Sequence, residues 1–189
     1  MSRIYRYFNQ ILFYLFLCIY ILLLAKILLF KQVSPFELFN SDRMISRTVS
    51  LTPFKTIFEY FSDANINIWI ALMNVVGNIV IFIPMGLYLQ IFKKNKNILN
   101  SVVLVFAVSL CVEVIQYILG IGSADTDDII LNTFGGFLGV LIYRIIYLLL
   151  KDEDKTKTAV TFLFCIICVC FGAWYIVCVN VLGLRIRIF

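Results

Sequence analysis

The sequence contains no histidine, and only 14% of its 189 residues are charged, against about 25% in an average soluble domain. Without histidine, the chain cannot form a Ser-His-Asp or Cys-His catalytic set or a histidine-containing zinc site. Its six cysteines all lie in apolar runs, and we interpret them as small buried apolar side chains and not as ligands. These shortages exclude a soluble enzyme domain and the commonest hydrolase mechanisms.

What the sequence has in abundance is apolar residues, which make up 62% of the chain. A membrane-spanning helix needs about 20 consecutive apolar residues, and five runs meet this length: Ile11–Phe30, Ile68–Phe92, Ile98–Leu119, Ile129–Leu150 and Ala159–Leu182. The predicted fold class is therefore all-α, a polytopic membrane helix bundle with about five transmembrane helices plus a short interfacial amphipathic helix.

The amphipathic helix is predicted inside the one long polar connection, residues 31–67. Thr52 and Pro53 resemble a helix start, because threonine caps helices and proline suits the first helical position. Apolar residues then recur with helical spacing at Phe54, Ile57, Phe58 and Phe61. The segment is too short to cross a membrane, so we expect it to lie in the interface.

The distribution of positive charge predicts the orientation of the chain. With the N-terminus inside, eight Lys or Arg residues fall in the inner segments and six in the longer outer ones. The positive-inside rule therefore places the N-terminus in the cytoplasm and an acidic turn, residues 120–128, outside the plasma membrane. The net charge of +5 is modest and indicates a preference for anionic lipid, not a nucleic-acid partner.

Polar residues within the apolar runs converge at one depth. At 1.5 Å of helix rise per residue, Glu113 and Asn132 lie roughly 10 Å from the acidic turn, and Asn74 and Asn78 lie roughly 10–15 Å from the start of the second span, which enters from the same side. A lone acid at the bilayer centre costs about 2.5–3.5 kcal/mol, so Glu113 should face the bundle and not the lipid. We predict a binding pocket built from Arg47, Asn74, Asn78, Glu113, Gln116, Asp125, Asp127, Asp128 and Asn132.

Structural interpretations compete with this pocket. Asp125 and Asp128, three residues apart at a helix start, could cap free N–H groups. Asn74 and Asn78 could hold helices together by hydrogen bonds, and the Gly135-to-Gly139 pair favours close helix packing over ligand contact. Glu113 is the hardest to explain in this way, because burying a carboxyl group is a costly means of joining helices.

Four stretches together are similar to the VanZ-like family of small bacterial membrane proteins. They are RTVSLTPFKTI at 47–57, NVVGNIVIFIPMG at 74–86, the pair Glu113 and Gln116, and DTDDIILNTFGGFLG at 125–139. The resemblance covers roughly residues 43–148. Many relatives carry an arginine in the turn before the aspartates, whereas this chain has Ile121, Gly122 and Ser123 there. Ser50 also stands where relatives often have asparagine.

This resemblance implies a division of the chain into an N-terminal anchor helix with the start of the outer loop (1–42), a VanZ-like helical core (43–150) and a C-terminal loop with the fifth helix (151–189). It also implies a role linked to glycopeptide resistance, above all to the lipid-tailed teicoplanin. The expected partner is a membrane lipid or lipid-linked amphiphile, bound in an outward-facing polar pocket without a cofactor.

Two other functions stay open. An intramembrane enzyme acting on a phospholipid or glycolipid would use Glu113 as its general acid or base, with Asp127 and Asp128 holding a divalent cation against a phosphate. A transporter would couple its flux to protons through Glu113, although five spans without an inverted repeat disfavour it.

Overall fold

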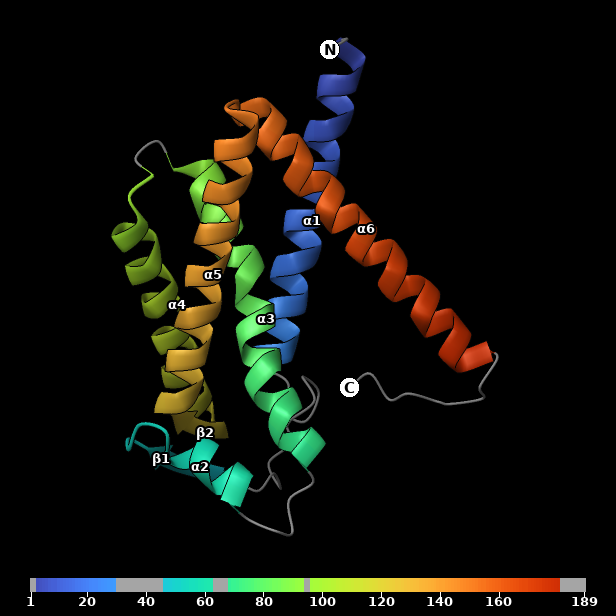
Figure 1. Ribbon diagram of the computed structural model, residues 1–189. Coiled ribbons are helices and arrows are strands. Elements are labelled where there is room, and N and C mark those ends of the chain that lie inside the picture. Colours follow the sequence, from blue (N-terminus) through green and yellow to red (C-terminus); the bar gives the residue numbers. More distant parts are fainter. Residues whose placement is uncertain (1–2, 30–45, 63–67, 94–95, 181–189) are drawn as a thin grey trace. The chain divides into compact units, whose positions relative to one another are not determined.

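A computed structural model describes residues 3–29, 46–62, 68–93 and 96–180. Its elements are, in order, α1 (Arg3–Leu29), β1 (Ser46–Ser50), α2 (Lys55–Ser62), α3 (Ile68–Phe92), α4 (Ile98–Leu119), β2 (Ile121–Asp125), α5 (Thr126–Leu150) and α6 (Glu153–Asn180) (Figure 1). The chain forms two compact units, residues 21–145 and residues 1–20 with 146–189.

The predicted class, an all-α membrane helix bundle, is confirmed. Four helices among the described residues are long and apolar enough to cross a membrane: Tyr7–Leu29, Ala71–Phe92, Ile98–Leu119 and Thr126–Leu150. The fifth expected span falls on α6, and most of its side chains lie outside the described part of the chain.

Glycines let α3 and α5 approach each other closely in the unit of residues 21–145. A Cβ atom added at Gly135 would lie 2.0 Å from the Ile79 carbonyl oxygen, and one at Gly139 would lie 2.0 Å from the Ile83 carbonyl oxygen. Gly136 faces the other way, against the side chain of Val105 on α4. This stripe of small residues therefore serves close helix packing, the role that its sequence favoured.

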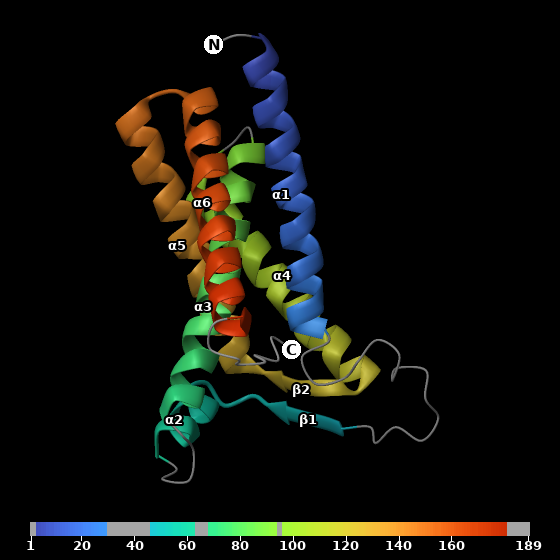
Figure 2. The same ribbon diagram turned by 90° about the vertical axis from the view of Figure 1, so that its right-hand side faces the viewer.

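β1 and β2 form a two-stranded parallel sheet at the end of the bundle where α4 ends and α5 begins (Figure 2). The sequence did not predict this sheet. Gly120 ends α4 in the left-handed conformation, with φ of 60°. Residues 121–125, expected to be part of a turn, then extend as β2 and pair with β1 in a register that sets Ser46 opposite Ile121 and Ser50 opposite Asp125. The expectation of a simple turn was wrong because β1 supplies a partner for its backbone.

The amphipathic helix exists as α2, but its predicted start was wrong. The helix begins at Lys55, and Thr52 and Pro53 belong to the turn before it. Phe54 adopts a positive φ of 63°, which is uncommon for a bulky residue and redirects the chain into the helix. Phe58 and Phe61 are exposed on α2, as expected for an apolar face that enters the membrane interface.

In the second unit, the start of α6 packs on the first turns of α1. The Asn9 side chain donates a hydrogen bond to Thr158 Oγ1 at 3.0 Å. Lys157 Nζ lies 4.2 Å from the ring centre of Phe13, and burial lowers the pKa of its ammonium group while Asp154 opposes this shift. Cys18 on α1 and Cys111 on α4 are both exposed, so the expectation of buried cysteines was wrong for these two.

Candidate functional site

The site is built where the sheet and α2 meet the end of α1, the start of α3, the end of α4 and the start of α5. Asp125, the last residue of β2, connects two of these elements. Its backbone N–H donates to Glu113 Oε2 at 2.9 Å, and its own Oδ1 accepts the Asp127 N–H at 2.9 Å. Asp125 therefore caps α5, and Glu113 fixes the position of the cap. Both carboxylates are buried, exposing 7% and 3% of their surface.

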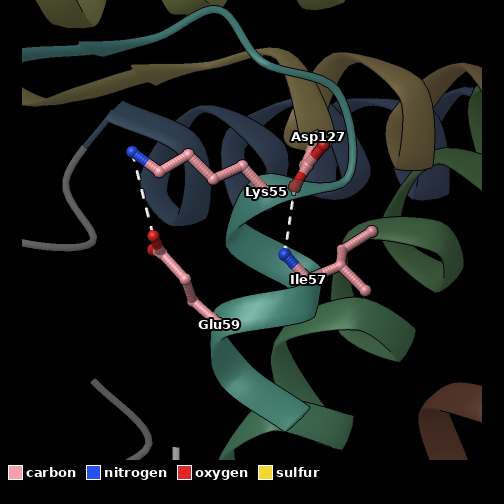
Figure 3. Close-up of polar contacts among 4 residues, drawn as sticks. All are labelled: Lys55, Ile57, Glu59 and Asp127. Carbon is pink, nitrogen blue, oxygen red and sulfur yellow. Dashed lines mark hydrogen bonds and ion pairs between the residues drawn. The ribbon is translucent and has the colours of Figure 1, made fainter. Parts of the chain in front are cut away.

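Asp127 caps a different helix, α2, which lies far from it in the sequence. Its carboxylate accepts the backbone N–H group of Phe54. It also accepts the backbone N–H group of Ile57 at 3.0 Å, as Figure 3 shows. The side chain is 1% exposed. A buried carboxylate that accepts N–H groups at the start of a helix satisfies orphan donors and complements the helix dipole. Asp127 thus attaches α2 to the start of α5.

Asp128 faces α3. Its Oδ1 accepts a hydrogen bond from the Asn78 side chain at 2.5 Å. Asn74, one turn earlier on α3, lines the cavity described below. Asn74 and Asn78 were predicted to share a face of the helix. Asn78 hydrogen-bonds to Asp128, whereas Asn74 faces the cavity.

Deeper in the bundle, α4 buries a row of residues at four-residue intervals, namely Ser101, Val105, Ser109 and Glu113. Asn132 on α5 is 1% exposed and donates to Ser109 Oγ at 2.9 Å, while its Oδ1 has no hydrogen-bond partner among the described residues. Gln90 on α3 donates to Ser101 Oγ at 2.8 Å, a buried pair that the sequence analysis missed. These contacts join α4 to its neighbours by polar side chains.

Gln116 and Arg47 make contacts with backbone carbonyl groups. Gln116 Nε2 donates to the Leu28 carbonyl oxygen on α1 at 2.7 Å. Arg47 on β1 donates from Nη2 to the Ile118 carbonyl oxygen at the end of α4, at 3.2 Å. Arg47 is therefore a side chain that holds the sheet to α4.

A cavity of about 320 Å³ opens between these elements. Of the nine predicted residues, Asn74, Gln116, Asp125 and Asp128 line it, whereas Arg47, Asn78, Glu113, Asp127 and Asn132 do not. The rest of the lining comes from Leu28, Thr48, Val49, Ser50, Lys55, Thr56, Glu59, Ile121, Gly122 and Ser123. The lining of the cavity is thus mostly polar, and the predicted residues outside it hold its walls together.

Sequence reasoning missed the contribution of α2 and β1 to this lining. The signal for α2 was the pair Lys55 and Glu59, which lie one turn apart on its polar face and form an ion pair at 3.8 Å (Figure 3). With Asp125 and Asp128 they give the lining three acidic groups and one basic group. The charge of the cavity therefore favours cationic groups and hydrogen-bond donors.

The divalent-cation site considered for Asp127 and Asp128 gains no further acidic ligand from the described residues. Among the residues that the structure describes, no group of three or more His, Cys, Asp or Glu side chains is close enough to hold a metal ion. Both oxygens of Asp127 accept backbone N–H groups, and Asp128 is bonded to Asn78.

The helices and the cavity define a multi-pass membrane protein with a polar cavity at one end of its helix bundle. The chain belongs to the VanZ/LLP1 family, whose model matches residues 16–149. It is 34% identical over 128 residues to Protein VanZ of Enterococcus faecium, an alignment that covers 67% of this chain and 70% of that protein. No solved structure matches the chain.

Proposed function

We propose that the cavity binds the polar head of a cell-envelope amphiphile, either a lipid-linked wall precursor or a lipopeptide. The observation that carries this proposal is the polar cavity of about 320 Å³ beside an amphipathic helix whose phenylalanines are exposed. A helix of this kind lies at the membrane surface, so the cavity would open where the head group of an amphiphile resides while its tail stays in the lipid.

The charge of the lining restricts which chemical groups of the amphiphile the cavity would accept. Glu59, Asp125 and Asp128 outnumber Lys55. Because like charges repel, the cavity would take an amine-, amide- or hydroxyl-bearing portion and not a phosphate. Teicoplanin, to which the family resemblance points, combines a peptide head with a lipid tail, and resistance to it would follow from its capture at the membrane.

The orientation is part of the same proposal. With the N-terminus in the cytoplasm, the positive-inside rule puts the cavity on the outer face of the bacterial plasma membrane. An outward cavity is accessible to lipopeptides and to wall precursors after their export.

Filling the cavity tests the proposal. Ser123 lies on β2, is exposed and lines the cavity, so Ser123→Trp should occupy it without disturbing the core. We expect teicoplanin binding to protein in lipid nanodiscs to weaken at least about tenfold, a loss of about 1.4 kcal/mol. The matched control is Ser62→Trp on α2, which is exposed and outside the lining.

Equal binding by the two tryptophan variants would place the ligand elsewhere on the protein. A glycopeptide without an acyl chain should bind more weakly than teicoplanin, because the tail contributes through the bilayer. If neither teicoplanin nor a lipid-linked precursor binds the wild-type protein, the proposal fails. The catalytic alternative would instead be supported by Mg²⁺-dependent turnover of a lipid that Glu113→Gln abolishes.

A further inference from the structure

A second cavity lies at the opposite end of α4, far along that helix from the polar site. It is a groove of about 850 Å³ between the start of α4 and the later turns of α5. The lining residues are Lys96, Asn97, Ile98, Leu99, Val102, Phe137 and Arg144. None of them belongs to the cavity proposed above, so this groove is a separate candidate site.

The charged groups in the lining are both cationic. Arg144 Nη2 donates to the Lys96 carbonyl oxygen at 2.9 Å, and Lys96 Nζ donates to the Tyr143 hydroxyl at 2.7 Å. These two contacts hold the side chains of Lys96, before α4, and Arg144, on α5, at one end of the groove. A guanidinium has five N–H donors in a fork that fits phosphate oxygens, and Arg144 uses one of them in this contact.

The start of α4 adds to this positive field. The Asn97 side chain accepts the Leu99 N–H at 2.9 Å and so fixes the first turn of the helix. The N-terminal end of a helix carries a partial positive charge. An anion at this end of the groove would therefore meet two cationic side chains and a helix dipole, with no acidic side chain in the lining.

The remainder of the lining is apolar and belongs to the membrane region. Ile98 begins the predicted span of α4, so Leu99, Val102 and Phe137 lie on the lipid side of the cationic pair. Leu99 is 67% exposed, which leaves apolar surface available for contact. The groove thus changes from cationic to apolar across the boundary at which a phospholipid changes from head group to chain.

We infer that this groove binds an anionic diacyl phospholipid. Its phosphodiester group lies against Lys96 and Arg144, and an acyl chain lies along Leu99, Val102 and Phe137. Basic pockets between transmembrane helices are established places for anionic head groups. A soluble phosphate would leave the apolar part of the groove unused. In the proposed orientation the lipid belongs to the inner leaflet.

The test measures lipid-specific stabilisation of the full chain in neutral detergent. Phosphatidylglycerol should raise the unfolding temperature, phosphatidylcholine should have a much smaller effect, and soluble glycerophosphoglycerol none, since a ligand stabilises the state that it binds. The double variant Lys96→Gln/Arg144→Gln should weaken the apparent affinity for phosphatidylglycerol at least tenfold. The control Lys151→Asn/Lys155→Gln, which removes two exposed charges outside the groove, should keep the wild-type affinity.

A second variant guards against loss of folding. Leu99→Glu alters an exposed side chain and places a carboxylate beside the cations, so it should keep the unfolding temperature of the lipid-free protein and lose the preference for phosphatidylglycerol. Wild-type preference in both groove variants would overturn the inference. Equal stabilisation by phosphatidylcholine, or by the soluble head group alone, would overturn it as well.

Discussion

Replacing Gly139 with alanine should strongly destabilise the bundle. The added Cβ would lie 2.0 Å from the Ile83 carbonyl oxygen and 3.1 Å from Gly86 Cα, and both of these atoms are backbone. No side-chain rotation relieves such a contact, so α3 and α5 must separate along their length. Overpacking of a core costs about 1–3 kcal/mol, and we expect a loss at the upper end of this range or beyond it.

Gly77 on α3 provides the matched control, because a Cβ there meets no atom within 4 Å. Gly77→Ala should raise stability by about 0.5–1 kcal/mol, since glycine disfavours a helix interior. Denaturant-induced unfolding in detergent, followed by circular dichroism, measures both variants. Changes of the same sign and size in the two would show that α3 and α5 do not pack through the Gly139 contact.

Replacing Asp127 with alanine should detach α2 from the end of the bundle. The substitution leaves the N–H groups of Phe54 and Ile57 without their carboxylate acceptor. A fully buried donor left unsatisfied costs about 1–3 kcal/mol, and these two donors are only partly buried, so we expect a combined loss of about 2–4 kcal/mol, in the lower part of the summed range. Asp127→Asn keeps one acceptor oxygen and should lose roughly half as much.

The control for Asp127 is Glu59→Ala, which removes an acidic group from α2 itself. Glu59 is exposed and pairs only loosely with Lys55, at 3.8 Å. Exposed pairs contribute about 0–1 kcal/mol, so the free energy of unfolding should change little. Limited proteolysis within residues 55–62 reports the detachment directly, and it should accelerate in Asp127→Ala alone. Equal cleavage of both variants would mean that Asp127 does not hold α2.

The detachment of α2 in Asp127→Ala would also change the proposed cavity. Lys55, Thr56 and Glu59 of α2 line it, so a detached α2 would open one wall. Asp127→Ala should therefore weaken teicoplanin binding without removing any residue of the lining. A loss of binding in this variant, together with a loss in Ser123→Trp, would show that the assembled cavity is required and not one side chain.

Much of the membrane architecture was predictable, since helical spans depend on local composition. The bounds of α3 and α4 were predicted to the residue, and α5 begins three residues earlier than expected because Asp125 caps it. The amphipathic α2 was also found, although its start was misplaced. Its true cap, Asp127, lies 70 residues from Ile57, and local capping patterns cannot show a partner at that distance.

The candidate site was predictable in part. Depth counting along the helices grouped the polar residues at one end of the bundle, but it could not say which of them face open space. Glu113 and Asn132 proved to be bonded to other polar groups, whereas Asn74 and Gln116 reach the cavity. The sheet was missed because neither of its five-residue strands has the alternating pattern of a half-buried strand.

The sequence by itself determined that this is a multi-pass helical membrane protein of the VanZ/LLP1 family, because apolar runs and ordered motifs are properties of the chain alone. Only the tertiary structure decided that Asp125 and Asp128 line the cavity, whereas Glu113 and Asp127 do not. That division depends on long-range hydrogen bonds, such as those between Asp127 and α2 and between Glu113 and the Asp125 backbone. Such bonds form only when the helices have packed, and no spacing within one segment encodes them.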